Sequence, residues 1–504
     1  MSNGPATALQ REGDLWQSAA TGRTWAVVVG LEVHVQLATR SKLFCPCEVT
    51  FGAEVNRHTC PTCTGHPGTL PRLNAEAVEL ALRAGLALGA DIAPESRFDR
   101  KNYFYGDLPR NYQITQQQAP FCTGGGLRLA SGKRIRLERI HLEEDAGKSL
   151  HDGEGPTLID LNRAGVPLIE AVTQPDLAGP EEAVEFLQAL REVLVYTGSA
   201  TADMEKGELR CDVNVSVHPV DEPWRTRIEV KNLNSFAGVA AAIEHELRRQ
   251  IAAWESEDPS RHPRSETRLF DAVLGRTEAM RAKEQEADYR YFPEPDLPPV
   301  TVSPARLAEL AARLPELPAA RRERYQRELR LSAYDAGVLT GSRAVADLFE
   351  ATARLSGQPK EAANWISNEV LRWLADDAVE ATTVEELLLR PHDLAELIGL
   401  VREGEVSRAS ARQVLGEMLR SGGAAADLVE SLGLRQVRDP GQVEAWCRGA
   451  VDGAPEAAAE VRAGNQRALG ALLGAVMRSS GGRAEPQLAR DLLLQLLGSA
   501  PSSE

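Results

Sequence analysis

The chain has 504 residues, enough for about three domains, and its 43% hydrophobic content is sufficient to build real cores, which excludes a disordered protein. Seven cysteines are too few for a disulfide scaffold. No apolar run reaches the roughly 18 residues of a membrane span, and the polar N-terminus lacks a signal-peptide core, so we expect a cytoplasmic protein without membrane contact. Because the formal net charge is −16, any nucleic-acid contact requires a local basic surface.

The first predicted strand follows a polar segment, residues 1–24, which we expect to be flexible. Residues 25–37 are rich in β-formers, and their second half alternates strictly between apolar and polar residues. Its two faces are Leu31, Val33, Val35 and Leu37 on one side and Glu32, His34 and Gln36 on the other. Glu32 and His34 lie about 7 Å apart along a strand, a spacing that suits one ion or a phosphate-bound metal. A solvated strand face is the alternative interpretation.

Four cysteines follow in two close pairs, Cys45 with Cys47 and Cys60 with Cys63. Two thiol pairs separated by a short loop are typical of a tetrahedral zinc site, and in a reducing compartment a metal is favoured over a disulfide. The alternative is four free thiols, because the single residue between Cys45 and Cys47 is a shorter spacing than zinc ligands usually have.

A helix is predicted over residues 73–88, and the aromatic and amide-rich residues 98–115 have the character of a ligand-lining loop. Within that loop Tyr103, Phe104 and Tyr105 either line a ligand site or pack together.

The most unusual stretch is residues 139–149, in which three carboxylates are adjacent: Glu143, Glu144 and Asp145. Adjacent carboxylates repel, so a hard divalent cation or a dense set of basic partners must neutralise them. Magnesium with a nucleotide phosphate fits best, and an ordinary charged turn is the alternative.

Further alternating runs at 157–161 and 208–217, and helices at 180–196 and 238–254, extend this pattern. Residues up to about 295 therefore predict an α+β unit in which several strands each present one polar face. The candidate ligands on or beside these strands are Glu32, His34, Glu143, Glu170 and Asp212. A single acid on a strand means little, but several from one domain can meet around a cation.

Six blocks of sequence resemble the B subunits of the aspartyl/glutamyl-tRNA(Asn/Gln) amidotransferase family, and the resemblance spans nearly the whole chain. These blocks are residues 30–37, 41–45, 139–149, 162–167, 231–236 and 288–299. The resemblance implies a cradle-like catalytic domain of mixed or antiparallel strands and helices at 25–299, an all-helical domain at 300–390, and a small helical tail at 391–504 that binds tRNA. It also implies a heterotrimer with two partners, an amidase (glutaminase) that releases ammonia and a small third protein that clamps the other two.

The implied reaction uses ATP to phosphorylate the side-chain carboxylate of Glu-tRNA(Gln) or Asp-tRNA(Asn), after which ammonia displaces the phosphate. Phosphoryl transfer depends on positioning and on charge neutralisation by Mg²⁺. The resemblance implies a metal shell of Glu32, His34, Glu143 and Glu170, with Asp212 as a further candidate. Chemistry alone suggests Lys148, Lys231 and Arg290 as phosphate contacts, and Lys231 joins Glu32, His34 and Glu143 as a candidate catalytic residue.

After residue 299, Ala, Leu, Arg and Glu dominate at helical spacing. From Pro391 onward 12 arginines face 15 acids, so the tail is the less acidic part of the chain, and no lysine occurs after Lys360. Arginine suits an RNA backbone, although genome composition also explains such a bias. Two other classes remain open: a tRNA-binding scaffold without a working kinase site, and a metal-dependent kinase or ligase acting alone on a small acid. Whether the substrate is Glu-tRNA, Asp-tRNA or both stays open.

Overall fold

The structure is a computed structural model that describes residues 9–150, 155–282, 286–376, 381 and 383–498. It divides into two compact units, Met1–Leu317 and Pro318–Glu504. None of the described helices is long and apolar enough to cross a membrane.

The first unit is built on a 12-stranded sheet. Its main path runs β17 (Arg276–Ala282), β16 (Glu266–Asp271), β15 (Ile228–Leu233), β14 (Leu209–Pro219), β3 (Thr24–Gln36), β13 (Pro167–Thr173), β10 (Arg134–Glu144), β8 (Cys122–Thr123) and β4 (Asp91–Ile92), with β1 (Leu9–Glu12), β2 (Leu15–Ser18) and β9 (Gly126–Arg128) off this path. Neighbouring strands are antiparallel except β15 and β16, which are parallel. The mixed sheet with its helices confirms the predicted α+β class.

Three smaller sheets complete the strands of this unit. They pair β11 (Lys148–Leu150) with β12 (Leu158–Asp160), β18 (Phe292–Pro293) with β6 (Asp99–Asn102) and β7 (Tyr112–Thr115), and β19 (Val300–Thr301) with β5 (Glu95–Ser96). Short 3-10 helices lie at Pro259–Arg261 and Glu286–Tyr289.

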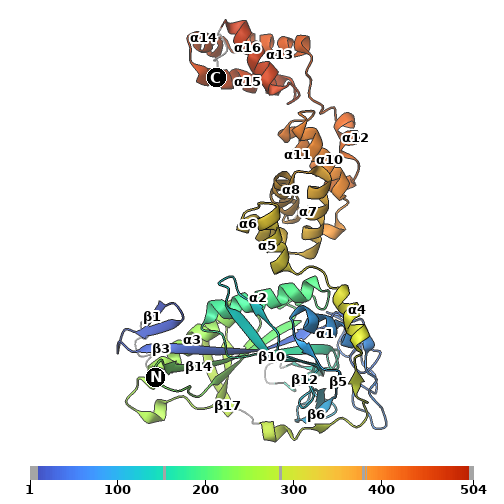
Figure 1. The fold of residues 1–504 in the computed structure, drawn as a ribbon, viewed down its shortest axis with the longest axis vertical. Helices are drawn as coiled ribbons and strands as arrows, with labels where there is room; N and C mark the ends of the chain where they lie inside the picture. Colours follow the sequence, from blue (N-terminus) through green and yellow to red (C-terminus); the bar gives the residue numbers. More distant parts are fainter. Residues whose placement is uncertain (1–8, 151–154, 283–285, 377–380, 382, 499–504) are drawn as a thin grey trace. The chain divides into compact units, whose positions relative to one another are not determined.

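Helices α1 (Ala75–Ala87), α2 (Pro180–Tyr196) and α3 (Phe236–Trp254) lie against the central sheet and confirm the three helices predicted in this region (Figure 1). Their starts follow capping chemistry, because Asn74 accepts from two amide groups of α1 and Pro180 occupies the first turn of α2. The core under them is the apolar face of β3, whose Val33 and Val35 are fully buried. The predicted alternation of β3 is therefore confirmed, and its polar face lies opposite the helices.

The N-terminal segment corrects one prediction. The expected flexibility of residues 1–24 is wrong for the described part, because β1 and β2 form an antiparallel hairpin that continues onto β3. The reason is Trp16, which is 6% exposed and belongs to the main core, with Arg11 over its indole ring. Because the residues around Trp16 are mostly polar, no hydrophobic pattern in the sequence predicts that it is buried. Residues 1–8 lie outside the described residues.

The end of the first unit also differs from prediction. Helix α4 (Pro304–Ala312) packs on α1, and its Leu310 is part of the same core. The unit therefore ends at Leu317 instead of the expected residue 299.

The second unit is helical in its described residues. Its helices are α5 (Pro318–Glu328), α6 (Ala333–Leu339), α7 (Arg343–Ser356), α8 (Pro359–Trp365), a π-helix (Ile366–Val370), α9 (Leu371–Leu374), a 3-10 turn (Val384–Glu386), α10 (Pro391–Arg402), α11 (Arg408–Ser421), α12 (Ala425–Ser431), α13 (Pro440–Gly453), α14 (Pro455–Arg462), α15 (Gln466–Ser479) and α16 (Pro486–Leu497).

Two separate cores lie within this unit, one from Tyr325 to Val429 and one from Val443 to Leu497. The predicted tail begins at residue 391, but α10 packs on α7 and contributes Leu394 and Leu397 to the first of these cores. The division between the cores therefore lies between Val429 and Val443. A proline at the start of a helix resembles a boundary in sequence, although it marks only the first turn.

Candidate functional site

The polar face of the central sheet gathers ionisable residues from four neighbouring strands. Strand register sets His141, Glu170, His34 and Arg210 in one row across β10, β13, β3 and β14. The next row is Arg139, Val172, Glu32 and Asp212. Residues far apart in sequence thus become neighbours through strand pairing.

Two carboxylates and two imidazoles form the centre of this face. His34 Nε2 lies 3.6 Å from Glu143 Oε1 and 3.4 Å from Glu170 Oε2. From the other side, His141 Nε2 lies 3.5 Å and 3.4 Å from the Oε2 atoms of the same two carboxylates. Ligand atoms of His34, Glu143 and Glu170 lie within 4.8 Å of one another. Two carboxylates and one imidazole from rigid strands form a donor set that suits a hard divalent cation.

A β-bulge explains why β10 presents these side chains. The register of β10 against β13 shifts between Leu137 and Arg139. Before the shift Leu137 faces the core, and after it Ile140 does, so the extra residue turns Arg139, His141 and Glu143 toward the polar face.

The three adjacent acids have separate partners. Glu143 faces the cluster and accepts a hydrogen bond from Thr115 Oγ1 at 3.0 Å. Glu144 forms an ion pair with Arg110 and accepts from the Ile114 amide. Asp145 pairs with Arg210 at 2.6 Å and with Arg163 at 3.5 Å. Basic partners therefore neutralise two of the acids, and only Glu143 remains directed at the cluster.

The electrostatics of the cluster favour positive charge. Burial alone would lower the pKa of His34, but Glu170, Glu143 and Asp212 raise it to about 9. Burial likewise opposes ionisation of Glu170, yet His141 and His34 hold the pKa of its carboxyl well below the usual range. The same carboxylates attract a divalent cation, which would displace the proton of His34 because only a neutral imidazole can bind a metal.

A cavity of about 320 Å³ lies over the cluster. Its lining is Glu32, His34, Lys101, Thr115, Gln117, Arg139, His141, Glu143, Glu170, Asp212, Arg227, Glu229, Lys231, Thr267, Tyr289 and Tyr291. All five predicted metal ligands therefore face one space. Glu32 accepts from Asn214 Nδ2 at 2.9 Å, and Asp212 lies 2.5 Å from Lys231 Nζ, so these two acids stand beside the three-residue ligand group.

Four lysine and arginine side chains line the cavity, and of these the sequence alone predicts only Lys231. Burial opposes the charge of this residue, but its pairing with Asp212 and Glu229 raises the pKa of its amine above the usual value. The other three are Lys101, Arg139 and Arg227, and none forms an ion pair with the residues that the structure describes. The buried Nε of Arg139 has no hydrogen-bond partner there. These cations are suited to an anionic ligand.

Two of the predicted phosphate contacts stay predictions, because they lie outside the lining of this cavity. Lys148 is exposed on the small β11–β12 hairpin. Arg290 has a positive φ of 46° and places its guanidinium over the ring of Phe104, 5.6 Å from the centroid. Neither lines the cavity.

The aromatic loop divides between packing and the cavity. Tyr103 contacts Tyr105 and Tyr289 at ring-centroid distances of 5.8 and 6.2 Å, and Lys101 lies over both Tyr103 and Tyr289. Phe104 is 67% exposed. The loop therefore lines the cavity with Lys101 and Thr115 and not with the three predicted rings.

His141 is the most informative residue that sequence reasoning misses. It is 3% exposed, touches both central carboxylates and has a buried Nδ1 with no partner among the described residues. The available signal is its position two residues before Glu143, which is the same-face spacing recognised for Glu32 and His34.

The four predicted cysteines converge in a second cluster. All four Sγ atoms lie within 4.8 Å of one another, and those of Cys60 and Cys63 are 3.9 Å apart. Sulfurs around a tetrahedral zinc stand ~3.8 Å apart, because each Zn–S bond is about 2.3 Å. The donor set fits zinc.

A buried lysine completes the cysteine cluster. Lys42 has no exposed surface; its Nζ lies 3.5 Å from Cys63 Sγ and donates to the carbonyls of His58 and Leu161. A hydrogen bond with Cys45, together with the charge of Lys42, lowers the pKa of Cys63 to about 4. Cys63 is thus prepared to be a thiolate, whereas a hydrogen bond with Cys63 and burial raise the pKa of Cys45.

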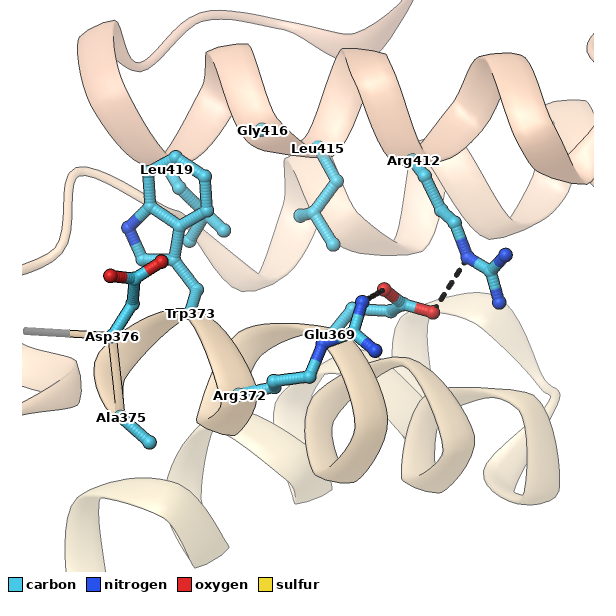
Figure 2. A pocket seen from close by; sticks show the side chains of 9 residues that line it. All are labelled: Glu369, Arg372, Trp373, Ala375, Asp376, Arg412, Leu415, Gly416 and Leu419. Carbon is cyan, nitrogen blue, oxygen red and sulfur yellow. Dashed lines mark hydrogen bonds and ion pairs between the residues drawn. The ribbon is translucent and has the colours of Figure 1, made fainter. Parts of the chain in front are cut away.

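The second unit carries a hollow of about 540 Å³ between the π-helix with α9 and α11 (Figure 2). Glu369 accepts from Arg412 Nε at 2.7 Å and from Arg372 at 3.4 Å, as the dashed lines in Figure 2 mark. Trp373 lies under the guanidinium of Arg420, 4.9 Å from the ring centroid. Arginines beside a partly buried indole form a surface suited to a nucleic-acid backbone and bases.

Comparison with known proteins matches both units. Residues 27–308 match the model of the GatB/GatE catalytic domain family, and residues 347–497 match that of the GatB domain family. The B subunit of the aspartyl/glutamyl-tRNA(Asn/Gln) amidotransferase of Myxococcus xanthus is 48% identical over 476 residues, covering 94% of this chain and 98% of that protein. The proteins of the same name from Thermosynechococcus vestitus and Caldicellulosiruptor saccharolyticus are 45% and 46% identical, covering 95% and 94% of this chain and 97% and 99% of their own lengths.

Proposed function

The chain belongs to the family of aspartyl/glutamyl-tRNA(Asn/Gln) amidotransferase B subunits, and we propose that its sheet cavity activates and amidates the side-chain carboxylate of a mischarged tRNA. The observation that carries this proposal is the convergence of His34, Glu143 and Glu170 beneath a cavity whose cations include three without a carboxylate partner among the described residues. Glu-tRNA(Gln) and Asp-tRNA(Asn) are both substrates compatible with the family name. The proposed substrate implies a cytoplasmic location, where tRNA is charged.

The chemistry requires activation because a free carboxylate is a poor acyl donor. In the proposed sequence the substrate carboxylate attacks the γ-phosphorus of ATP and ADP leaves, which produces an acyl phosphate. Ammonia then attacks the acyl carbon, loses a proton, and inorganic phosphate leaves as the amide forms. Enzymes accelerate phosphoryl transfer mainly through positioning and charge neutralisation.

We assign the ligand group His34, Glu143 and Glu170 to Mg²⁺, with Glu32 and Asp212 as the two further acids that line the same cavity. The cation would supply charge neutralisation at the phosphate oxygens. Lys101, Arg139 and Arg227 would bind the phosphate oxygens. Lys231, which pairs with Asp212, would orient that carboxylate. His141 would fix the two carboxylates through its Nε2.

We assign a structural zinc to Cys45, Cys47, Cys60 and Cys63, because four thiolates leave no open coordination position for substrate. Lys42 would offset the excess negative charge of such a site.

Two protein partners follow from the proposed chemistry and the family. Ammonia must come from a glutamine-hydrolysing amidase, and a small third protein would complete the heterotrimer. The tRNA would contact the arginine-lined hollow and the tail, which the second core of this unit limits to residues 439–504.

To test the tail, we would remove residues 439–504, which leaves the core from Tyr325 to Val429 intact. The KM for mischarged tRNA should rise while the KM for ATP stays unchanged, because the second core of this unit is a separate packing unit. An unchanged KM for tRNA would contradict a role of the tail in tRNA binding.

The decisive experiment replaces Glu143 with Gln in the assembled complex. Glu143→Gln keeps the side-chain shape but removes a charge from the ligand group, which should cost several kcal/mol of transition-state stabilisation and orders of magnitude in rate. Amidated tRNA would be measured with glutamine and with ammonium chloride, alongside basal glutaminase activity. Both amidation rates should collapse while glutaminase activity persists. Glu257→Gln, at an exposed acid in the same unit, is the matched control.

Each alternative predicts a different outcome. Near-normal amidation by Glu143→Gln would overturn the assignment of the site and favour a scaffold whose chemistry lies elsewhere. ATP-dependent phosphorylation of a free small acid without tRNA or partner would favour a stand-alone kinase.

A further inference from the structure

The four thiols of the cysteine cluster differ in their access to solvent. Cys45 and Cys63 are 7% and 6% exposed, whereas Cys47 and Cys60 are partly exposed. The other three cysteines of the chain are buried. Because oxidation of a thiol depends on its exposure and on its thiolate character, a small oxidant reaches this cluster first at Cys47 or Cys60.

Cys60 shares one turn of the chain with Cys63, and their Sγ atoms are 3.9 Å apart. The turn is held by its own hydrogen bonds, because the Thr64 amide donates to the Cys60 carbonyl at 3.1 Å and the Cys60 amide donates to Cys63 Sγ at 3.2 Å. A disulfide needs its sulfurs about 2.05 Å apart. Side-chain rotations within this turn can close the gap, whereas a bridge from Cys47 to Cys60 would have to join two separate segments.

Cys63 is the thiol whose surroundings best stabilise a negative charge. Lys42 Nζ lies 3.5 Å from its Sγ, and the Cys60 amide donates to the same atom. A nearby ammonium group and an amide donor both favour the thiolate, which is the nucleophilic form of cysteine. The turn therefore places a partly exposed thiol, Cys60, directly beside a buried thiolate that can react with it.

We propose that Cys60 and Cys63 form a peroxide-sensitive thiol pair, whose oxidation to a disulfide releases the zinc of the cysteine cluster. The inference rests on the zinc assigned under the proposed function and does not depend on the carboxylate cavity. It adds a site of reversible modification, with hydrogen peroxide or an organic peroxide as the oxidant.

The proposed oxidation has two steps. The Cys60 thiolate attacks one oxygen of the peroxide, the O–O bond breaks and hydroxide leaves, so that Cys60 becomes a sulfenic acid. The Cys63 thiolate then attacks the Cys60 sulfur, the S–O bond breaks and a second hydroxide leaves as the disulfide forms. Peroxide gains the two electrons that the sulfurs lose, and water protonates both hydroxides. Only Cys45 and Cys47 then remain as thiolate ligands, which is too few for a tetrahedral structural site.

Two asparagines anchor the loop between the cysteine pairs independently of the metal. Asn56 Oδ1 accepts from the Leu161 amide at 2.7 Å. Asn162 accepts from the His58 amide at 2.8 Å and donates to the Glu54 carbonyl at 2.7 Å. These bonds should keep the turn in place after the zinc leaves, so a thiol reductant together with zinc should restore the cluster.

The first test exposes the zinc-loaded full chain to hydrogen peroxide in the presence of a chromogenic chelator. Free thiols are then alkylated under denaturing conditions, and disulfides are located by peptide mass spectrometry. Zinc release should be complete and should follow the same time course as a Cys60–Cys63 disulfide. The buried Cys122, Cys211 and Cys447 should stay reduced and serve as internal controls. Dithiothreitol and added zinc should return the metal to the protein.

Two variants, compared with zinc-stripped wild type, test the separate roles of the thiols. Cys63→Ser should stop at the first step, so dimedone, a reagent for sulfenic acids, should label Cys60. Cys45→Ser is the matched control, because it also removes one zinc ligand but should still form the Cys60–Cys63 disulfide at the wild-type rate. The wild-type measurement decides the matter if either variant fails to fold.

The outcomes separate this inference from the zinc assignment. Zinc retained after prolonged exposure to peroxide would overturn the thiol switch, and so would zinc release without a disulfide or with a bridge between any other pair. A disulfide in Cys63→Ser would overturn the role of Cys63 as the second nucleophile. Wild-type protein purified without zinc would contradict the zinc assignment instead, and disulfide mapping would then show whether the thiol pair itself responds to peroxide.

Discussion

The two ligand clusters of the first unit are assembled in opposite ways. The cysteine cluster draws its four thiols from one short segment, Cys45–Cys63, and surrounds them with a buried lysine and backbone. The carboxylate and histidine cluster draws His34, Glu143 and Glu170 from three strands and opens into a cavity lined by cations. A local, closed cluster is suited to stabilising a fold, whereas one that spans a sheet and stays open is suited to chemistry.

Removing a side chain from the open cluster should cause the strongest loss of amidation activity. His34→Ala removes the imidazole between Glu143 and Glu170, and loss of one metal ligand should lower amidation by several orders of magnitude with either ammonia donor. His141 still contacts both carboxylates, so the fold should persist. Amidated tRNA and circular dichroism would be measured together. A variant that lost activity only by unfolding would show that the open cluster is structural.

Removing one thiol from the closed cluster should cause the next strongest change, a loss of zinc and of stability. Cys60→Ser should abolish stoichiometric zinc and lower the melting temperature, because binding free energy of a structural metal is folding free energy. Zinc would be measured by elemental analysis of gently purified protein and stability by calorimetry. The variant that stays folded at low temperature should retain Mg²⁺-ATP binding. Wild-type protein without zinc but with full stability would contradict the comparison.

The same contrast explains which parts of the site sequence alone can predict. The spacing of Cys45, Cys47, Cys60 and Cys63 predicts convergence because a short loop limits where the thiols can lie. The alternation of β3 predicts that Glu32 and His34 share a face. Their meeting with Glu170 and Glu143 depends on the strand order β14-β3-β13-β10, which no local pattern specifies. The polar strand faces make these residues candidates for one cation, and the resemblance to a family groups them as a metal shell.

The errors have the same physical origin. His141 escapes prediction because the bulge in β10 sets which residues reach the cavity, and a bulge has no clear sequence signal. Lys148, on a hairpin, and Arg290, in a left-handed turn, do not line the cavity, and their role as phosphate contacts stays a prediction. The hairpin at residues 9–18 escapes prediction because a single buried tryptophan, Trp16, anchors it among polar residues. Local periodicity predicts helices and strands well; it does not predict which distant side chains meet.

A smaller loss of amidation activity should follow from replacing His141, which contacts both carboxylates of the open cluster. His141→Gln should reduce amidation about 10- to 100-fold, the usual cost of losing a partner that orients metal ligands. Because the substitution leaves the three ligands in place, raising the Mg²⁺ concentration should recover part of the activity, and it should not do so for His34→Ala. Activity would be titrated against Mg²⁺ for both variants. Identical behaviour would place the two histidines in the same role.

The smallest effect concerns the cation beside the thiolates. Lys42→Met preserves most of the side-chain length but removes the ammonium group that lies 3.5 Å from Cys63 Sγ. It also leaves the carbonyl of His58 without this donor, at a cost of about 1–3 kcal/mol, whereas the carbonyl of Leu161 still accepts from the Ala164 amide.

Without that positive charge a four-thiolate zinc site carries an uncompensated double negative charge, so zinc affinity should fall about tenfold and chelator should remove the metal faster. A competition assay with a chromogenic chelator would measure this. Mg²⁺-ATP binding at the open cavity should not change, because Lys42 does not line it. Equal zinc affinity in Lys42→Met and wild type would mean that the lysine fills space, and that the closed cluster, unlike the open one, does not depend on a neighbouring cation.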